Sequence, residues 1–427
     1  MEITTLIVLL LVLFFLGIPV FLALGLAALL CFIVFTDTPL VNVAHVMFVS
    51  VNRYSLLCVL FFVYAGKIMA HGELANRLIN FVKVNVGFLP AGLAMAAIGA
   101  CALFGAISGS TLATLVAIGG IMYPSLIKEG YDPEFSVGVI TVGSILGMLV
   151  PPNLSMVVYG VFANQSIARL FMAQYLPAFI IMFGFWAYIY YWGKKRNFRK
   201  SSPPSFKEIV LSFRDGFWAL MLPVILFVGI YSGIFTATEA SVVATVYALL
   251  AEIFIYKDLN LRDFYKITVD TAMIAGLCTI PVAAGGVFGE YLNIQQIPDR
   301  VCILTTSLIS SKFVFLLLIN LLFGVAGCLI DIITAIVIFT PVLLPLLPIF
   351  DISPIHFGVI FMFNMGFGFV TPPFGINLFA AIKMWNLGFT RTVRGCIPFL
   401  IIAFALVLVI TYCPFLTTFL VDLWFGK

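Results

Sequence analysis

The length of its uninterrupted apolar runs constrains this chain more than any other feature. Residues 6–35, for example, contain no charged side chain. A helix needs about 20 apolar residues to cross the hydrocarbon core of a bilayer, so such runs are long enough to span it. A membrane β-barrel would instead alternate apolar and polar residues in strands of about ten. The sequence therefore predicts an all-α polytopic membrane protein, with room for about ten to twelve membrane segments.

Composition excludes a water-soluble fold. Charged residues make up only 9% of the 427 residues, whereas soluble domains carry about 25%. The net charge of +4 is small and the basic residues lie in short connections, so nucleic acid is not expected as a partner. Eight cysteines and three histidines are scattered through apolar runs, a pattern that indicates helix packing rather than a metal cluster. The first apolar stretch lacks a basic leader and a cleavage site, so we expect a retained membrane helix.

A basic loop at residues 194–215 separates two similar halves. Short matches recur between the halves at offsets of 219 to 221 residues. They pair Leu103-Phe104-Gly105 with Leu322-Phe323-Gly324, Gly138-Val139-Ile140 with Gly358-Val359-Ile360, Pro151-Pro152 with Pro372-Pro373, and Ala28-Leu29-Leu30 with Ala248-Leu249-Leu250. The loop carries seven basic residues, namely Lys194, Lys195, Arg196, Arg199, Lys200, Lys207 and Arg214. The positive-inside rule places it in the cytoplasm.

Equivalent connections of the two halves differ in charge. Residues 36–46 contain no Lys or Arg, whereas residues 257–266 contain three. The two connections should therefore face opposite sides of the membrane. We expect an inverted-topology repeat, with residues 1–193 and 236–427 as the two repeats. Residues 194–235 then hold the cytoplasmic loop and a connecting span that resets the orientation.

Small and polar residues interrupt a long apolar segment at the same place in each half. The interruptions are Gly105-Ala-Ile-Ser-Gly-Ser-Thr111 and Gly324-Val-Ala-Gly-Cys-Leu-Ile-Asp331. We interpret residues 103–127 and 322–349 as re-entrant hairpins whose tips reach the middle of the bilayer. Exposed backbone is tolerated there only beside protein or water.

A Pro-Pro pair follows each hairpin, at Pro151-Pro152 and Pro372-Pro373. Proline has no N–H and ends the helix, so carbonyls near Gly147 and Val150, or near Gly368 and Thr371, lose their helical partners. With the hydroxyls of Ser108, Ser110 and Thr371, these oxygens suit Na⁺ better than a divalent ion, which would recruit several carboxylates. A single Pro-Pro pair is most simply a structural kink; two pairs at repeat spacing favour ion binding.

Asp331 lies inside an apolar segment, where a carboxylate is costly and therefore a candidate functional group. The alternative is that it caps the second helix of its hairpin, and both roles are compatible. Thr236 and Glu239 are interpreted as a structural helix start. Half-helices that begin at the breaks direct N–H groups inward, which favours an anionic solute.

These motifs, together with Val-Pro-Pro-Asn at 150–153 and Thr-Pro-Pro-Phe-Gly-Ile-Asn-Leu-Phe at 371–379, resemble the large membrane subunit of tripartite ATP-independent periplasmic (TRAP) transporters. Within this family, the chain as a whole is more similar to the sialic acid branch. The resemblance covers essentially the whole chain. It implies a Na⁺-driven secondary transporter with the elevator-type fold of the ion transporter superfamily, in the bacterial inner membrane. It implies a small four-helix membrane subunit and a periplasmic substrate-binding protein as partners, and a small organic acid such as a C4-dicarboxylate or a sialic acid as solute.

The resemblance also implies site residues. One Na⁺ site would use Ser108, Ser110, Gly147, Val150 and Pro152, and a second would use Gly324, Gly368, Thr371 and Phe374. The solute would lie near Ser110, Ser155 and Asp331. On the sequence matching, Ser108 and Ser110 correspond to Gly327 and Leu329, so the second site would depend more on backbone carbonyls.

Two other hypotheses compete with this one. A standalone Na⁺-coupled carboxylate symporter of the same superfamily would need no binding protein. An intramembrane enzyme or proton-translocating respiratory subunit would need clustered ionisable or metal-binding side chains within the spans. Only Asp331 and Glu239 fit that requirement, so we expect no enzymatic activity and no organic cofactor.

Overall fold

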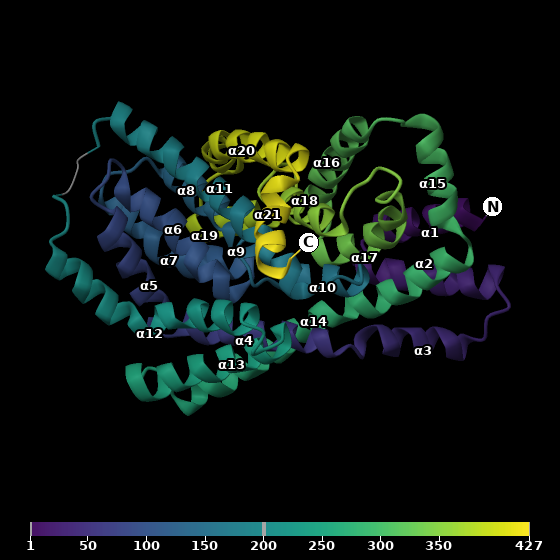
Figure 1. The fold of residues 1–427 in the computed structure, drawn as a ribbon, viewed down its shortest axis with the longest axis horizontal. Helices are drawn as coiled ribbons and strands as arrows, with labels where there is room; N and C mark the ends of the chain where they lie inside the picture. Colours follow the sequence, from purple (N-terminus) through teal and green to yellow (C-terminus); the bar gives the residue numbers. More distant parts are fainter. Residues whose placement is uncertain (1, 199–201, 427) are drawn as a thin grey trace.

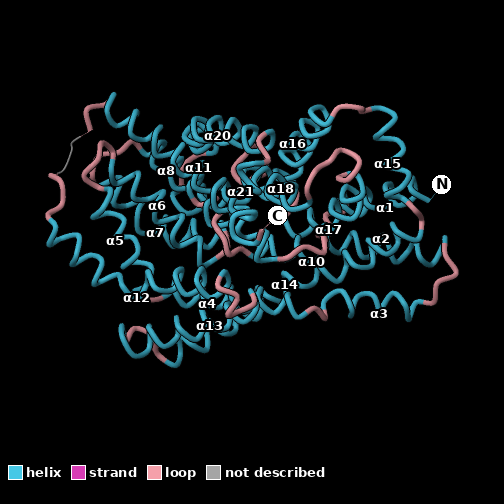
Figure 2. The backbone as a smooth tube through the Cα atoms, in the orientation of Figure 1, coloured by secondary structure: helices cyan, strands magenta, loops and turns pink. Residues whose placement is uncertain are grey.

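The computed structural model describes residues 2–198 and 202–426. Helices are the regular secondary structure of these residues, and no strand occurs among them. Short loops join the helices (Figure 2). Arg199 and Lys200 of the basic loop lie outside the described residues. The prediction of an all-α polytopic membrane protein is confirmed.

Eight helices of the described residues are long and apolar enough to cross a membrane. A ninth is counted if the helices around the first Pro-Pro pair, bent by 42°, form one span. This is fewer than the ten to twelve segments expected, because several apolar runs bend into shorter helices. Apolar content sets how much chain the bilayer holds, whereas the positions of bends depend on individual Gly and Pro residues.

The first half contributes eleven α-helices, followed by one connecting helix. They are α1 (Glu2–Phe15), α2 (Val20–Phe35), α3 (Leu40–Val51), α4 (Leu57–His71), α5 (Glu73–Val86), α6 (Gly92–Ser108), α7 (Thr111–Lys128), α8 (Pro133–Gly143), α9 (Leu146–Leu149), α10 (Leu154–Phe162), α11 (Ile167–Lys195) and the connecting α12 (Phe206–Tyr231).

The second half repeats this order with fewer interruptions. It consists of α13 (Ala237–Leu250, extended by a π-helical turn over Ala251–Tyr256), α14 (Leu261–Ile294), α15 (Ile297–Leu308), α16 (Lys312–Leu329), α17 (Ile332–Leu343), α18 (Pro354–Gly368), α19 (Ile376–Trp385), α20 (Phe389–Tyr412) and α21 (Phe415–Phe425).

The helices form two groups (Figure 1). The hairpin body contains α6–α11 and α16–α21, and its centre is α18, which is buried from His356 to Gly368. The peripheral layer contains α1–α5 and α12–α15; most of it lies along the lower and right edges of Figure 1, and α5 lies on the left beside α6 and α7. Because α18 is buried on all sides, its sequence is apolar all round rather than amphipathic.

The two halves exchange partners in both groups. In the peripheral layer, α2 packs along α14 and α13 packs along α4. In the hairpin body, α8 packs along α20. Each repeat therefore completes its packing with helices of the other, and the two form one structure.

Candidate functional site: two hairpins and two helix breaks

The first hairpin, α6–α7, turns at Gly109. This residue has φ +58°, which favours glycine, and an added Cβ would lie 3.2 Å from the Pro152 carbonyl oxygen. Ser110 then caps α7, because its Oγ accepts a hydrogen bond from the Ala113 N–H at 3.4 Å. The hairpin covers residues 92–128, so its first helix begins eleven residues before the start expected at residue 103. Its tip lies directly against the first Pro-Pro pair.

Close backbone contact holds the first hairpin to the first break, residues 150–153. A Cβ on Gly105 would collide with the Gly147 Cα, and one on Gly147 would lie 2.8 Å from the Ser110 carbonyl oxygen. The Ser108 and Thr114 hydroxyls lie 3.3 Å apart, and Thr114 donates to the Ser110 carbonyl at 2.8 Å. Hydroxyl and carbonyl oxygens therefore gather where the hairpin meets the break.

Of the five residues expected at the first Na⁺ site, Ser108, Ser110, Gly147 and Pro152 meet at this contact, and Val150 precedes the prolines. Because Pro151 lacks an N–H, the Gly147 carbonyl has no donor at the next helical turn. Hydroxyl and free carbonyl oxygens are the type of ligand that an alkali cation binds. The Pro151–Pro152 and Pro372–Pro373 peptide bonds are both cis.

The second hairpin, α16–α17, turns through Ile330 in an extended conformation. Asp331 caps α17: its carboxylate accepts the Thr334 N–H at 2.9 Å and also the Thr334 hydroxyl. The capping alternative for Asp331 is confirmed. A contact between the same carboxylate and a solute stays a prediction.

The helix caps show which residues of the two hairpins are equivalent. Ser110 and Asp331 both cap the second helix of their hairpin and lie 221 positions apart. The pairing of Ser108 and Ser110 with Gly327 and Leu329 is therefore wrong by two residues. The matching triplets around Gly105 and Gly324 set that offset, and apolar helices allow such slips because neighbouring turns have similar composition.

At the second break, residues 369–375, Gly327 takes the place that Gly105 has in the first half. Its added Cβ would lie 3.0 Å from the Gly368 Cα. Gly324 lies nearly one turn earlier on α16 and lines, with Thr371, a cavity of about 560 Å³. The Thr371 hydroxyl donates to the Phe367 carbonyl at 2.7 Å. The residues expected at the second Na⁺ site are thus more spread out, and the Phe374 side chain is 60% exposed.

Two buried asparagines hold the breaks in place. Asn153 caps α10 by accepting the Met156 N–H at 2.8 Å and donates to Gln174 at 2.7 Å. Asn377 accepts from Thr111 at 3.1 Å and donates to Ser144 at 2.9 Å, which links the first hairpin tip to the second half. Sequence reasoning assigned them no role, although each lies within four residues of a Pro-Pro pair.

The residues expected near the solute lie in different environments. Ser110 lines a cavity of about 400 Å³ between the first hairpin and the peripheral layer. Ser155 is buried beside Met148, to whose sulfur its hydroxyl donates at 3.9 Å, and its neighbour Leu154 lines the cavity. Asp331 lies at the other hairpin tip.

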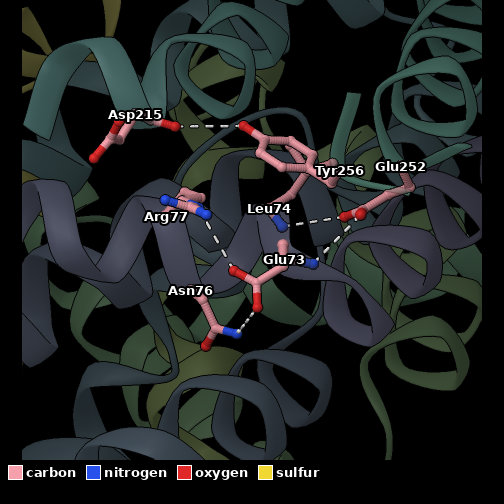
Figure 3. A network of polar contacts seen from close by, with 7 residues as sticks. All are labelled: Glu73, Leu74, Asn76, Arg77, Asp215, Glu252 and Tyr256. Carbon is pink, nitrogen blue, oxygen red and sulfur yellow. Dashed lines mark hydrogen bonds and ion pairs between the residues drawn. The ribbon is translucent and has the colours of Figure 1, made fainter. Parts of the chain in front are cut away.

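A buried carboxylate joins the peripheral layer to the first hairpin (Figure 3). Helix α5, which leads from α4 to α6, begins after Gly72, a residue with no capping side chain. Glu252 of the π-helical turn accepts the Leu74 N–H at 3.1 Å and the Glu73 N–H at 3.3 Å. Helix α15, in the equivalent position before the second hairpin, begins after Gln296 with no side-chain cap.

Figure 3 also shows two weaker contacts beside this cap. Glu73 lies 3.5 Å from Arg77, and the Tyr256 hydroxyl donates to the Asp215 carbonyl at 3.5 Å. Elsewhere in the peripheral layer, Thr236 and Glu239 form a reciprocal capping box at the start of α13. This confirms their interpretation as a structural helix start.

Comparison with known proteins identifies relatives over nearly the whole chain. Residues 7–416 match the family described as "Tripartite ATP-independent periplasmic transporter, DctM component". The C4-dicarboxylate TRAP transporter large permease protein DctM of Rhodobacter capsulatus is 33% identical over 93% of this chain and 94% of its own length.

Two longer relatives are also similar. The isethionate TRAP transporter permease protein DctMQ of Oleidesulfovibrio alaskensis is 35% identical over 94% of this chain, and the match spans 64% of that relative. The sialic acid TRAP transporter permease protein SiaT of Haemophilus influenzae is 33% identical over 97% of this chain and 67% of its own length.

Among solved structures, the YdaH transporter of Alcanivorax borkumensis has a similar fold. The TM-score is 0.65 at 12% identity, over 90% of this chain and 88% of that one. At this level of identity, the likeness concerns the fold alone.

Proposed function

Because the chain belongs to the DctM family of tripartite ATP-independent periplasmic transporters, we propose that it is the membrane permease of a Na⁺-coupled importer of a small organic acid. It works in the bacterial inner membrane with a small four-helix membrane subunit and a periplasmic substrate-binding protein. One observation carries the proposal: two helical hairpins each pack, glycine to glycine, against a Pro-Pro break.

The oxygen atoms at the first hairpin support Na⁺ as the coupling ion. The hydroxyls of Ser108 and Thr114 lie 3.3 Å apart, Thr114 donates to the Ser110 carbonyl, and both Thr114 and Ser110 pack against Gly147, whose own carbonyl loses its helical donor to Pro151. Hard cations prefer such oxygen ligands, and a set of hydroxyl and carbonyl oxygens without a carboxylate suits a monovalent ion. A cation there ties the hairpin tip to the break, so its occupancy controls the shape of the solute site.

The contact between the two groups of helices supports an elevator mechanism. Gly66 of α4 lies against Ser108 of the first hairpin, and Gly285 of α14 lies against Val337 of the second. These two glycines are 219 positions apart, so each repeat places a glycine of the peripheral layer against its own hairpin, at Ser108 near the tip in one half and at Val337 within α17 in the other. The glycine at each contact lets helices of the two groups approach closely, and we propose these contacts as the surface along which the hairpin body moves past the peripheral layer.

An organic acid is the solute class of the three relatives described above. Their names give isethionate, C4-dicarboxylate and sialic acid, all anionic at neutral pH. We extend this class to the present chain, with a sialic acid or a C4-dicarboxylate as the first candidates.

The test is uptake into proteoliposomes that contain the purified permease with its small subunit. We expect uptake of an organic acid only with an inward Na⁺ gradient and added binding protein. Uptake that is unchanged when K⁺ replaces Na⁺ would reject Na⁺ coupling. Uptake by this chain alone, without binding protein, would instead identify a standalone symporter.

A further inference from the structure

The cavity of about 400 Å³ beside the first hairpin is apolar on nearly all sides. It is lined by Val63, Gly66, Lys67, Ala70, Ser108, Ser110, Leu112, Ala113, Val116, Ala117, Leu154 and Ile274. The lining comes from α4 and α14 of the peripheral layer and from α6, α7 and α10 of the hairpin body. The cavity therefore lies between the two groups of helices that move relative to each other in the proposed mechanism.

Lys67 brings a positive charge to this lining. In the described part of the chain, its ammonium has no ion-pair or hydrogen-bond partner, whereas His71, one turn later on α4, lies 3.4 Å from Asp263. An ammonium group beside apolar side chains loses hydration that only an anion or polar groups can replace. The cavity thus presents an unpaired cation to whatever enters it.

The position of Lys67 is set by a close contact between the two groups of helices. A Cβ on the preceding residue, Gly66, would lie 2.8 Å from the Ser108 Cα. The side chain of Lys67 therefore emerges next to the hairpin tip that carries Ser108 and Ser110. In the other half, Gly285 and Gly286 lie 219 positions after Gly66 and Lys67, so the position that corresponds to Lys67 carries no charge.

A structural role accounts for only part of this arrangement. Basic residues near the C-terminal end of a helix interact favourably with its dipole, and Lys67 lies one turn before the end of α4. A lysine pointing to solvent, or His71 in the last turn, meets that need equally well. Neither requires the ammonium to line a cavity beside Ser110.

We propose that Lys67 binds the anionic group of the transported solute from the peripheral layer, while the Ser110 hydroxyl contacts it from the hairpin. The inference rests on the proposed function, since it assumes that this cavity carries the solute. The rest of the lining is apolar, and buried hydroxyls without partners are costly. The cavity therefore favours compact organic anions with few hydroxyl groups, so that of the two first candidates it favours a C4-dicarboxylate over a sialic acid.

The experiment uses the complete transporter in proteoliposomes with its binding protein, and isethionate, succinate and N-acetylneuraminate as probes. Lys67→Met keeps length and removes charge; Lys67→Arg keeps charge. Lys128→Met is the matched control, because Lys128 lies in the last turn of α7 and is exposed. For the probe that the wild type transports, we expect kcat/KM to fall about tenfold or more in Lys67→Met, chiefly through KM. Lys67→Arg should stay within about threefold and Lys128→Met within about twofold of the wild type.

A second measurement uses the wild-type chain and does not depend on a variant that folds. An amine-reactive reagent acylates Lys67, and peptide mass spectrometry measures the rate with and without the saturating probe. We expect the probe to protect Lys67 and leave Lys128 unchanged. Equal kcat/KM in Lys67→Met and Lys128→Met, or no protection of Lys67 by a transported probe, would overturn the inference. Absence of wild-type uptake for all organic acids would instead reject the proposed function.

Discussion

The two hairpin tips share a backbone plan and differ in chemistry. In both, a glycine of the first helix lies against a glycine before a Pro-Pro pair, Gly105 against Gly147 and Gly327 against Gly368. The caps of the second helices are a hydroxyl at Ser110 and a carboxylate at Asp331. Glycine and proline thus maintain the shape of each half, and we propose that the different side chains at the two tips serve ion binding and solute binding.

The largest effect is expected from substitutions at the glycine contact that the two halves share. Gly105→Ala and Gly327→Ala should each reduce uptake about 10- to 100-fold, because the added Cβ meets backbone that cannot shift cheaply. Uptake rates at matched protein content measure this. Gly120→Ala is the control, since no atom lies within 4 Å of its added Cβ. If alanine is tolerated at only one of Gly105 and Gly327, the two glycines do not have the same role.

The next effect separates charge from capping at the second tip. Asparagine caps helices as well as aspartate does, so Asp331→Asn keeps the hydrogen bond from the Thr334 N–H and removes the charge. We expect uptake to fall about tenfold with normal membrane insertion and unchanged thermal stability. Wild-type uptake in this variant would reduce Asp331 to its capping role.

A third test concerns the hydroxyls at the first tip. Ser108→Ala and Ser110→Ala should raise the half-saturating Na⁺ concentration about three- to tenfold, because each removes an oxygen from the proposed ion site. Na⁺ titrations of uptake measure the change. Leu329→Ala, at the position equivalent to Ser108, should leave Na⁺ dependence unchanged. An identical Na⁺ dependence in both serine variants contradicts the site.

The smallest expected effect lies at the helices that lead into the hairpins. Glu252→Gln should slow uptake about two- to threefold, because a neutral amide oxygen accepts the two N–H groups of α5 more weakly than a carboxylate. Gln296→Ala, before α15, removes no side-chain cap and should leave the rate unchanged. Equal rates in both variants would show that the two connecting helices behave alike despite their different starts.

Much of this architecture follows from local sequence. Apolar runs predict the helices, prolines predict the breaks, and the Thr236–Glu239 and Asp331 caps are short-range patterns that one segment can satisfy. The exact register of the repeats is harder to predict, because similar apolar turns match almost as well when displaced by two residues. Ser110 and Asp331 become equivalent only when both caps are seen.

Long-range contacts limit the rest of the prediction. Asn377 bonds to Thr111, 266 positions earlier, and Glu252 bonds to Leu74, 178 positions earlier. A polar residue near a helix end is equally compatible with solvent exposure and with burial against a distant segment. The Pro-Pro pairs point to the neighbourhoods of Asn153 and Asn377, but their partners depend on how the halves pack.

The exchange of partners between the repeats also affects how the chain is made. Helix α2 is synthesised long before α14, its main neighbour, and α4 long before α13. At about 5–20 residues per second, the wait lasts roughly 10–50 s. During biogenesis the first half must therefore persist in the membrane as an incomplete intermediate. Lipids or the insertion machinery shield its helix faces until the second half arrives.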